Sequence, residues 1–261
     1  MTSEFGDLHA APRTAIVTGG ARRIGAELSR MLAADGWHVL IHCRDSAEAA
    51  EALAAEIGHA HCIAADLADP GAARAILDAA AGMPPPGLLV NNASGFVFDS
   101  FDDFSAAGWD AHMNVNLRAP ALLSQAFVHA LPAGMPALIV NILDAKLAAP
   151  NTDFFSYTIS KMGLAGLTEL SARALAPRGI RVAGIAPSVT LISGEQTAEN
   201  FRSVHGLNPL GRGVTTDQIV DALRFVIATP TFTGQTITLD GGLRFLGLPR
   251  DVQYMKDMDQ A

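Results

Sequence analysis

Residues 13–25 read RTAIVTGGARRIG, and their residue types predict a strand, a tight turn and the start of a helix. Residues 13–18 are apolar and rich in β-branched side chains, which is typical of a short buried strand. Residues 24–34 are apolar at helical spacing, and Gly36 follows them as a helix-ending glycine often does. The stretch therefore predicts a strand–turn–helix unit at the front of the chain.

The rest of the chain continues this alternation. We expect further strands at 39–42, 61–65, 88–90, 137–143, 180–185 and 235–239, and helices at 46–57, 70–81, 109–130, 156–176 and 216–228. The strands are apolar throughout rather than alternating, so both faces of the sheet should be covered. The pattern predicts an α/β fold, a Rossmann-type, doubly wound parallel sheet of seven strands with helices on both faces.

No stretch rich in glycine, serine or charge divides the chain, so we expect one domain over 13–261 behind a flexible tail at 1–12. Residues 187–215 are long for a connection and contain glycines and prolines. A loop of that length in a compact domain is usually functional, and we expect it to close over a substrate. Residues 244–261 predict no element of their own.

The composition excludes several classes of function. A net charge of −8 argues against a general nucleic-acid binder and against an anionic membrane surface. Residues 1–12 show no signal-peptide pattern, and no apolar run reaches the roughly 18 residues of a membrane span. Cys43 and Cys62 form no disulfide framework, and the eight histidines show no metal-ligand spacing. We therefore expect a cytoplasmic protein without a metal that acts on small molecules.

The turn after the first strand suits a phosphate group. In Rossmann-type folds a glycine-rich turn at this junction places a pyrophosphate at the helix N-terminus. Folds that prefer NAD usually end the second strand in Asp or Glu, whereas this chain has Cys43 followed by Arg44. Together with Arg22 and Arg23, Arg44 suits a 2′-phosphate, which indicates NADPH/NADP as the cofactor. The alternative is that Arg22 and Arg44 are ordinary solvated side chains.

Tyr157 and Lys161 are four residues apart on an expected helix, so their side chains lie on one face. A lysine ammonium beside a phenol favours the phenolate, and we therefore expect a lowered pKa for Tyr157. A tyrosine with its pKa shifted toward neutrality can exchange a proton with a carbonyl or an imine. Asp144 lies thirteen residues earlier at a strand end, where open α/β sheets bind their ligands.

Four motifs lie in register: the loop 18–25, the stretch 91–93 (Asn-Asn-Ala), Asn116, and Tyr157 with Lys161. With them, residues 13–243 resemble the short-chain dehydrogenase/reductase family. The resemblance implies that Tyr157 is the proton donor, that Lys161 binds the nicotinamide ribose, and that Asn116 supports a water-linked proton path. The implied cofactor-binding residues are Thr18, Gly19, Arg22, Arg23, Ile24, Arg44, Asp66, Leu67, Asn92, Ala93, Tyr157, Lys161 and Pro187. Such enzymes usually form tetramers through two long helices, here 109–130 and 156–176.

Two departures from the family pattern are informative. Arg23 stands where the family usually has glycine, and Asp144 stands where it usually has a serine. Both departures, and the stretch 91–96, are similar to the pteridine reductases and the bacterial dihydromonapterin reductases. In that subgroup an aromatic residue, here Phe96, stacks the pterin, and the arginine reaches cofactor phosphate and pterin. The implied substrate-binding residues are Arg23, Ser94, Phe96, Asp144 and Tyr157.

Three of these substrate contacts have a structural alternative. Phe96 is alternatively a packing aromatic, Asp144 a strand-end cap, and Arg23 a residue that binds phosphate only. On the resemblance, the sequence predicts an NADPH-dependent reductase of a dihydropterin-like ring, with Asp144, Tyr157, Lys161 and Asn116 as the catalytic residues. Two alternatives stay open: a carbonyl reductase of the same family acting on a ketone or 3-oxoacyl compound, and a non-catalytic NADP-binding sensor.

Overall fold

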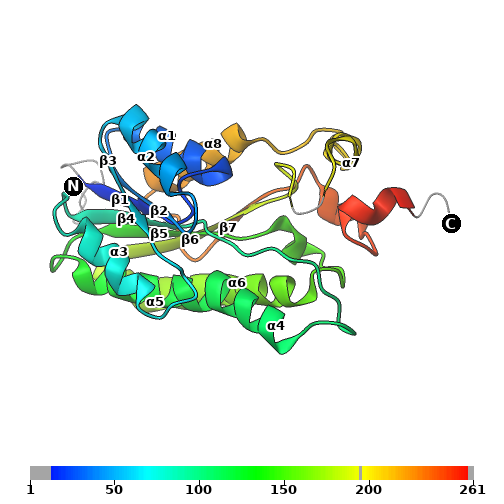
Figure 1. Ribbon diagram of the computed structural model, residues 1–261, viewed down its shortest axis with the longest axis horizontal. Coiled ribbons are helices and arrows are strands. Elements are labelled where there is room, and N and C mark those ends of the chain that lie inside the picture. Colours follow the sequence, from blue (N-terminus) through cyan, green and yellow to red (C-terminus); the bar gives the residue numbers. More distant parts are fainter. Residues whose placement is uncertain (1–12, 194–195, 258–261) are drawn as a thin grey trace.

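The computed structural model describes residues 13–193 and 196–257. Its strands form a parallel sheet in the order β3-β2-β1-β4-β5-β6-β7 (Figure 1). The strands are β1 (Thr14–Val17), β2 (His38–Cys43), β3 (Ala60–Ala64), β4 (Pro86–Asn91), β5 (Ala137–Ile142), β6 (Ile180–Pro187) and β7 (Thr236–Leu239). Each neighbouring pair is parallel, which confirms the expected seven-stranded Rossmann-type sheet.

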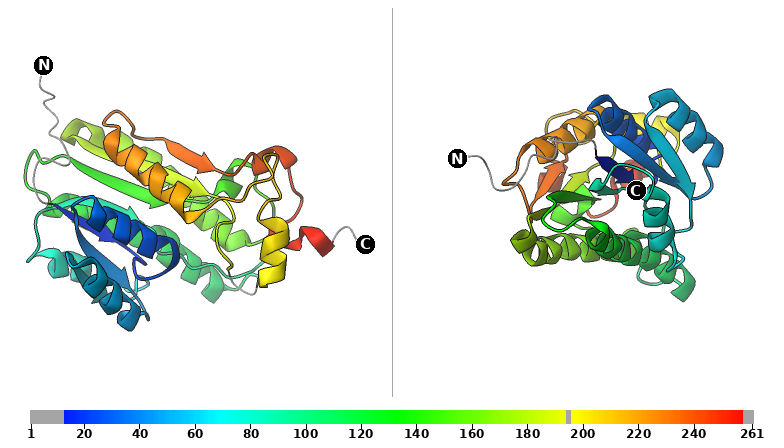
Figure 2. Two further views of the ribbon diagram at one scale, coloured as in Figure 1. Left: turned by 90° about the horizontal axis from the view of Figure 1, so that it is seen from above. Right: turned by 90° about the vertical axis from the view of Figure 1, so that its left-hand side faces the viewer.

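Helices cover both faces of this sheet. The α-helices are α1 (Arg23–Ala34), α2 (Ala47–Ile57), α3 (Ala72–Ala80), α4 (Ala106–Met113), α5 (Ala119–Ala130), α6 (Phe155–Leu175), α7 (Ala198–Val204) and α8 (Thr216–Ala228). Helices α1, α2 and α8 lie on one face, and α3, α5 and α6 lie on the other (Figures 1 and 2). Within the described residues, no helix combines the length and the hydropathy needed to cross a bilayer.

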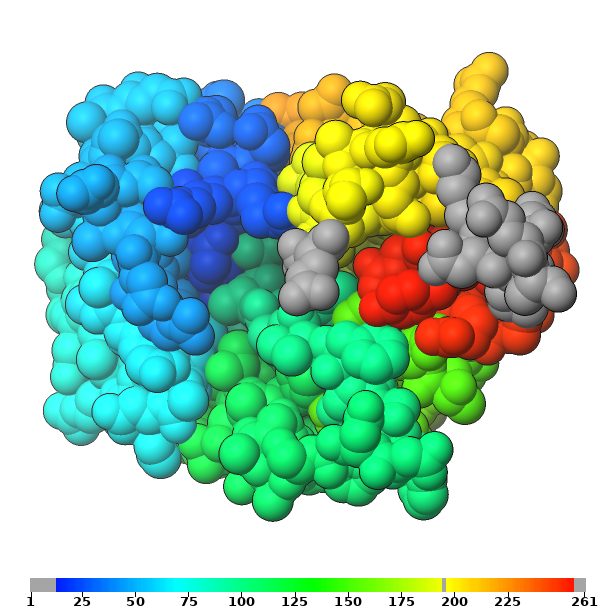
Figure 3. All heavy atoms as spheres, turned by 45° about the vertical axis from the view of Figure 1, so that its right-hand side comes forward, coloured from blue at the N-terminus to red at the C-terminus, as the bar shows by residue number. Residues whose placement is uncertain are grey.

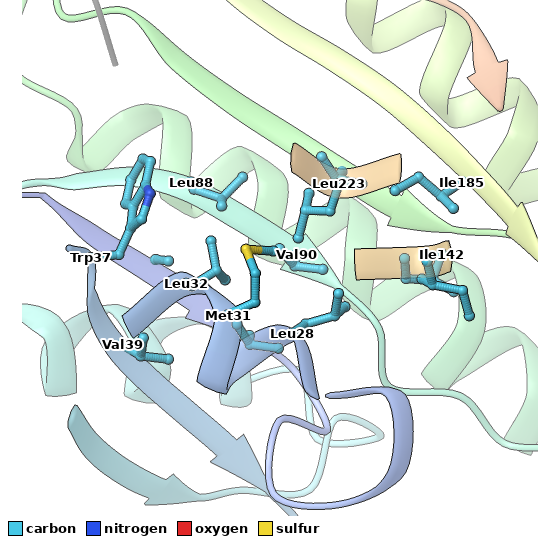
Figure 4. Close-up of a cluster of buried hydrophobic side chains, with 14 of the residues drawn as sticks. Leu28, Met31, Leu32, Trp37, Val39, Leu88, Val90, Ile142, Ile185 and Leu223 are labelled. Atoms are coloured by element: carbon cyan, nitrogen blue, oxygen red, sulfur yellow. The ribbon is translucent and has the colours of Figure 1, made fainter. Parts of the chain in front are cut away.

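The strands are apolar throughout because they bury side chains on both faces. In β1, Ala15 and Val17 pack with the cluster under α1 and α8, whereas Ile16 packs with the cluster under α3 and α5. Figure 4 shows the first cluster, in which Leu28 and Leu32 of α1 lie near Leu223 of α8 over the sheet. This two-sided burial explains why the strands show no alternation in the sequence.

The single helix expected over 109–130 is wrong in detail. Helices α4 and α5 are separated by a π-helical turn, η1 (Asn114–Arg118). Pro120 follows this turn and has no amide hydrogen to donate to the carbonyl of Asn116, so the regular α-helical ladder is broken there. The turn contains Asn116, which is one of the expected catalytic residues.

The C-terminal stretch also differs from its prediction. Instead of lacking structure, it forms two 3₁₀-helices, η4 (Leu243–Leu246) and η5 (Val252–Asp257). Residues of η5 pack against α7, the short helix in the 187–215 connection, and Asn200 Nδ2 donates to the carbonyl of Gln253 at 2.8 Å. Both segments lie at the same end of the molecule (Figure 2). The predicted tail 1–12 and residues 194–195 and 258–261 lie outside the described residues.

Candidate active site

A cavity of about 840 Å³ opens at the carboxyl ends of the central strands. It lies where β1 and β4 are neighbours, the point at which the strand order reverses and such sheets bind ligands. Figure 3 shows this side of the molecule, with a recess between the loop after β1 (blue) and the segment after β6 (yellow). Fifteen of the predicted residues line the cavity, namely Gly19, Arg22, Arg23, Ile24, Arg44, Asp66, Leu67, Asn92, Ala93, Ser94, Phe96, Asp144, Tyr157, Lys161 and Pro187.

Thr18 does not line the cavity; it holds the glycine loop from behind. Its Oγ1 accepts hydrogen bonds from the backbone N–H groups of Asn92 and Ala93, at 2.9 and 3.0 Å. Asn92 Nδ2 donates in return to the carbonyl of Thr18 at 2.9 Å. A Cβ at Gly25 would come within 2.1 Å of the carbonyl of Gly19, so only glycine permits this close turn. The end of β4 therefore fixes the shape of the glycine loop.

Arg23 has a backbone φ of +55°, in the left-handed region that favours glycine. This conformation explains why the family can place glycine at the same position. The Arg23 guanidinium donates to the carbonyl of Ile192 at 2.6 Å, in the connection that follows β6. Arg23 therefore links the glycine loop to the expected substrate loop 187–215, across the mouth of the cavity.

The other two arginines are exposed at the same end of the cavity. Arg44 forms an exposed ion pair with Asp45 at 2.5 Å, and Arg22 lies exposed at the N-cap of α1. Cys43, buried at the end of β2, takes the position where NAD-preferring folds usually have a carboxylate, and the nearby carboxylate of Asp45, which also lines the cavity, is paired with Arg44. Asp66 also lines the cavity, and its Oδ1 accepts from the backbone N–H of Ala68 at 2.8 Å.

His42 belongs to the site, although no motif in the sequence pointed to it. Its Nδ1 accepts from the backbone N–H of Gly19 at 3.2 Å, and its Nε2 lies 3.0 Å from the carbonyl of Ala65. These partners require a neutral ring with the proton on Nε2. Burial lowers the pKa of His42, which favours the same form. His42 thus ties the glycine loop to the ends of β2 and β3.

The three expected proton-handling side chains meet in the cavity. Tyr157 Oη donates to Asp144 Oδ2 at 2.7 Å, and both groups line the cavity. Lys161 Nζ donates to the carbonyl of Ile142 at 2.8 Å and lies 5.8 Å from the centre of the Tyr157 ring. Asp144 also begins the 3₁₀-helix η2 (Ala145–Ala148), where its Oδ1 accepts from the backbone N–H of Lys146 at 2.8 Å. Asp144 is therefore both a cap and a partner of the tyrosine.

The expected lowering of the Tyr157 pKa is wrong. Burial raises the pKa of Tyr157 well above its ordinary value, and the negative charge of Asp144 adds to the shift. Lys161 is itself buried, which lowers its pKa to about 8, with Asp144 acting in the opposite direction. The prediction considered only the lysine, whereas the side chain that touches the phenol is a carboxylate. At neutral pH Tyr157 therefore holds its proton.

Asn116 does not line the cavity and is fully buried in the π-helical turn. Its Oδ1 accepts from the backbone N–H of Gly95 at 2.8 Å and from Ser94 Oγ at 3.2 Å. Its Nδ2 donates to the carbonyl of Gly95 at 2.9 Å and to Ser160 Oγ at 3.0 Å. In this arrangement Asn116 anchors the backbone next to Ser94 and Phe96.

Aromatic rings form one wall of the cavity. Phe96 stacks on Phe154 with ring centres 4.1 Å apart, and its ring meets Tyr157 edge-on at 4.7 Å. Phe154 has a φ of +52°, which is rare for an aromatic residue and marks a strained backbone of the kind found at functional sites. Phe96 therefore does both things that the sequence left open: it packs on Phe154, and it also lines the cavity where a substrate could contact it.

Two further residues that the sequence did not indicate are Lys146, from the 3₁₀-helix η2, and Asp251, from the C-terminal segment. Lys146 and Asp251 line the cavity, and their Nζ and Oδ2 atoms are 3.6 Å apart. Asp251 is placed there by the preceding residue, since Arg250 Nε donates to both carboxylate oxygens of Asp153. Over the described residues, no cluster of three or more His, Cys, Asp or Glu side chains could hold a metal ion.

Comparison with known proteins agrees with this geometry. The family described as short chain dehydrogenase matches residues 13–202. The structure of FolM alternative dihydrofolate reductase 1 from Brucella canis, complexed with NADP, is 38% identical with a TM-score of 0.88, covering 92% of this chain and 97% of that chain. A short chain dehydrogenase from Burkholderia cenocepacia J2315 in complex with NADP is 35% identical with a TM-score of 0.81, covering 88% and 97%. L-xylulose reductase of Bos taurus is 32% identical, covering 90% of this chain and 98% of that protein. The chain is thus an oxidoreductase that belongs to the short-chain dehydrogenase family.

Proposed function

We propose that this protein is an NADPH-dependent reductase of a dihydropterin-like ring. The observation that carries the proposal is the 2.7 Å hydrogen bond from Tyr157 Oη to Asp144 Oδ2 inside the cavity. A carboxylate beside the proton donor suits a substrate whose ring nitrogens need protons, whereas a ketone oxygen needs a neutral donor. The similarity to two FolM alternative dihydrofolate reductases at 38% identity supports the same assignment.

The residues at the glycine loop fit NADP. The N-terminus of α1 and the close turn at Gly19 and Gly25 leave backbone exposed to a pyrophosphate. Arg22 and Arg44 lie exposed near Cys43, and β2 ends in this cysteine rather than in Asp or Glu. A 2′-phosphate would bind the two arginines and would replace Asp45 as the partner of Arg44. Three structures similar to this chain are complexes with NADP. When bound, NADPH would supply the hydride.

Tyr157 is assigned to deliver the proton. Because burial and Asp144 raise its pKa, Tyr157 stays a phenol at neutral pH, which is the form a reduction requires. After transfer, the resulting phenolate is a strong base and takes a replacement proton through Asp144, its hydrogen-bond partner. Lys161 places a positive charge 5.8 Å from the centre of the Tyr157 ring, where its Nζ donates to the carbonyl of Ile142. Asn116 anchors the adjoining backbone at Gly95.

The remaining contacts are assigned to the substrate ring. Phe96 presents an aromatic surface at the cavity wall, and a planar ring stacks favourably on such a surface. Arg23 and Ser94 line the same space and supply hydrogen-bond donors. The 187–215 connection, tied to Arg23 through the carbonyl of Ile192, would cover the bound ring and exclude water.

A carbonyl reductase is the second candidate. The observation that favours it is the similarity to carbonyl-reducing relatives, such as L-xylulose reductase of Bos taurus at 32% identity. In such an enzyme the group beside Tyr157 needs only to orient a ketone oxygen. Replacing Asp144 with serine would then preserve activity, which separates the two candidates.

The test measures NADPH oxidation at 340 nm with 7,8-dihydropterins and, in parallel, with ketones and 3-oxoacyl compounds. We expect wild type to reduce a dihydropterin, and Asp144→Ser to lose at least about a hundredfold in kcat for it, the usual scale for one proton-transfer group. Ketone turnover alone that survives in Asp144→Ser would identify the carbonyl reductase instead. Binding of NADPH without turnover of any of these compounds would indicate a non-catalytic NADP-binding sensor.

A further inference from the structure

A second buried polar cluster lies next to the aromatic wall and takes no part in the proton transfer described above. It consists of Asp99 from the loop after β4, His112 from α4 and Ser156 from the first turn of α6. Asp99 is 9% exposed, His112 3%, and Ser156 0%. Neither the family motifs nor the proposed reaction assigns these three side chains a role.

The cluster is a continuous chain of hydrogen bonds. Ser156 Oγ donates to Asp99 Oδ2, and the Ser156 backbone N–H donates to Asp99 Oδ1 at 3.0 Å. His112 Nδ1 lies 2.6 Å from Ser156 Oγ. The backbone N–H of Val97 donates to His112 Nε2 at 3.2 Å. Since Nε2 is an acceptor, the neutral ring carries its proton on Nδ1 and donates it to Ser156.

Asp99 also caps the helix that carries the proton donor. Helix α6 begins after Phe154, whose side chain makes no capping hydrogen bond. The first free N–H groups of the helix instead meet Asp99, because the Phe155 N–H donates to its carbonyl at 3.1 Å and the Ser156 N–H donates to its carboxylate. A carboxylate at a helix N-terminus is also favoured by the helix dipole. One end of this hydrogen-bond chain is therefore Ser156, the residue next to Tyr157 in the first turn of α6.

The other end of the chain reaches the backbone beside Phe96. Val97 follows Phe96 directly, and its side chain is 68% exposed, so packing does little to hold Val97 itself. The Phe98 side chain packs edge-on against Phe154 and Tyr254, with ring centres 5.3 and 5.6 Å apart. On the N-terminal side, Asn116 holds Gly95. The bond to His112 is the matching anchor on the C-terminal side of Phe96.

We propose that His112 is a positioning residue for substrate binding. By accepting the Val97 N–H, it holds the Phe96 ring at the distance from Tyr157 that a stacked substrate requires. This proposal rests on the proposed function, because it takes Phe96 as a substrate-contacting side chain. His112 does not line the cavity, and it meets the Tyr157 ring edge-on with ring centres 6.1 Å apart. The substitutions below keep a side chain in this place, so they should change substrate affinity more than the rate of chemistry.

Two amide variants test the two hydrogen bonds of the His112 ring separately. His112→Asn keeps a donor where Nδ1 stands and removes the acceptor for Val97, whereas His112→Gln places an acceptor near the position of Nε2 and removes the donor to Ser156. Loss of one hydrogen bond is worth about a factor of five. We therefore expect His112→Asn to raise KM for the dihydropterin about fivefold with kcat and the NADPH KM little changed. His112→Gln should restore KM to near the wild-type value.

Hydrogen exchange of the Val97 amide provides a readout that needs no substrate. The exchange should be faster in His112→Asn and close to wild type in His112→Gln. Equal exchange in both variants, or equal substrate KM, would overturn the inference. His112→Leu, which keeps most of the volume and has no acceptor, replaces His112→Asn if that variant does not fold. If wild type reduces no dihydropterin, the proposed function fails, while Val97 exchange still decides the role of His112.

Discussion

Arg23 and Phe154 are, over the described residues, the non-glycine positions with a positive φ, at +55° and +52°. Each such backbone costs roughly 1–3 kcal/mol and persists only where surrounding contacts hold it. Arg23 is held by its bond to the carbonyl of Ile192, and Phe154 by stacking on Phe96. Arg23 lines the cavity, and Phe154 packs on Phe96, which also lines it, so both strained positions lie at or beside the place where a ligand would bind.

Lys161 illustrates at the residue scale how a functional charge reduces stability. Burial lowers its pKa to about 8, so at pH 7 it is still charged, but the charge has a higher free energy in the folded protein than in the unfolded chain. We predict that Lys161→Met raises the free energy of unfolding of the cofactor-free enzyme at pH 7 by up to about 3 kcal/mol, because a shift of one unit corresponds to about 1.4 kcal/mol. The same variant should lose at least about a hundredfold in kcat. Urea unfolding and steady-state kinetics check both effects.

The difference in stability between wild type and Lys161→Met should depend on pH. Between pH 8 and about 10.4 the unfolded chain binds more protons at Lys161 than the folded one, so wild-type stability rises with pH relative to Lys161→Met. The difference between the two proteins should therefore shrink above pH 8. A variant that is less stable than wild type at pH 7 would mean that the bond to the carbonyl of Ile142 outweighs the cost of burying the charge.

His42 should make the folded protein sensitive to mild acid. Its lowered pKa means that, as the pH falls below about 6.5, the unfolded chain takes up a proton before the folded one does. The stabilising contribution is thus complete above that pH and is lost as the pH falls through the folded pKa. His42→Asn keeps an acceptor for the Gly19 N–H and cannot titrate. We expect the stability of wild type relative to His42→Asn, measured by urea unfolding from pH 7.5 to 5, to decrease on the acid side.

At the scale of secondary-structure elements, the end of α8 depends on one side chain from β6. Arg181 Nη1 donates to the carbonyls of Val226, Thr229 and Phe232, at 2.8, 3.1 and 3.1 Å. Its Nη2 donates to the carbonyl of Ile227 at 3.1 Å. The last carbonyls of a helix have no partners within the helix, so the guanidinium completes the C-terminus of α8 from the neighbouring strand.

We predict that Arg181→Lys destabilises the protein by about 2–4 kcal/mol, because one ammonium group cannot reach four separate carbonyls and leaves buried acceptors unpaired. Urea unfolding at pH 7 measures the loss. The kcat at low temperature, where the variant is folded, should be close to that of wild type, since α8 contributes no catalytic group. Arg224, an exposed arginine of the same helix paired with Asp35, is the matched control, and Arg224→Lys should cost less than about 1 kcal/mol.

At the scale of the whole molecule, apolar side chains of α6 and of the segment before α4 are exposed. Leu170 is 68% exposed and Met162 40%, and Phe101 nearby in the chain to α4 is 70% exposed. Exposed apolar groups of this size on neighbouring elements mark an association surface. We predict a tetramer, with a mass by light scattering of four times 27.2 kDa. Leu170→Asp should reduce that mass, whereas Ala55→Asp, the same charge change on exposed α2, should not.

The sequence by itself determined the features that depend on local spacing. Apolar strands between amphipathic helices predicted the sheet, and the four-residue interval from Tyr157 to Lys161 predicted a shared helix face, because both signals depend on neighbouring residues. The fold and the family were therefore correct from the sequence. A proline's missing amide, at Pro120, was also readable, although its consequence for the helix was not foreseen.

Only the tertiary structure decided the features that depend on long-range distance and burial. The pKa of Tyr157 rises because a carboxylate and the protein interior, rather than the lysine alone, surround its hydroxyl. The capping of α6 by Asp99 joins residues 57 apart, and the bond from Arg250 to Asp153 joins residues 97 apart. No periodicity in the sequence records such pairs, since they exist only once the packed core has brought their elements together.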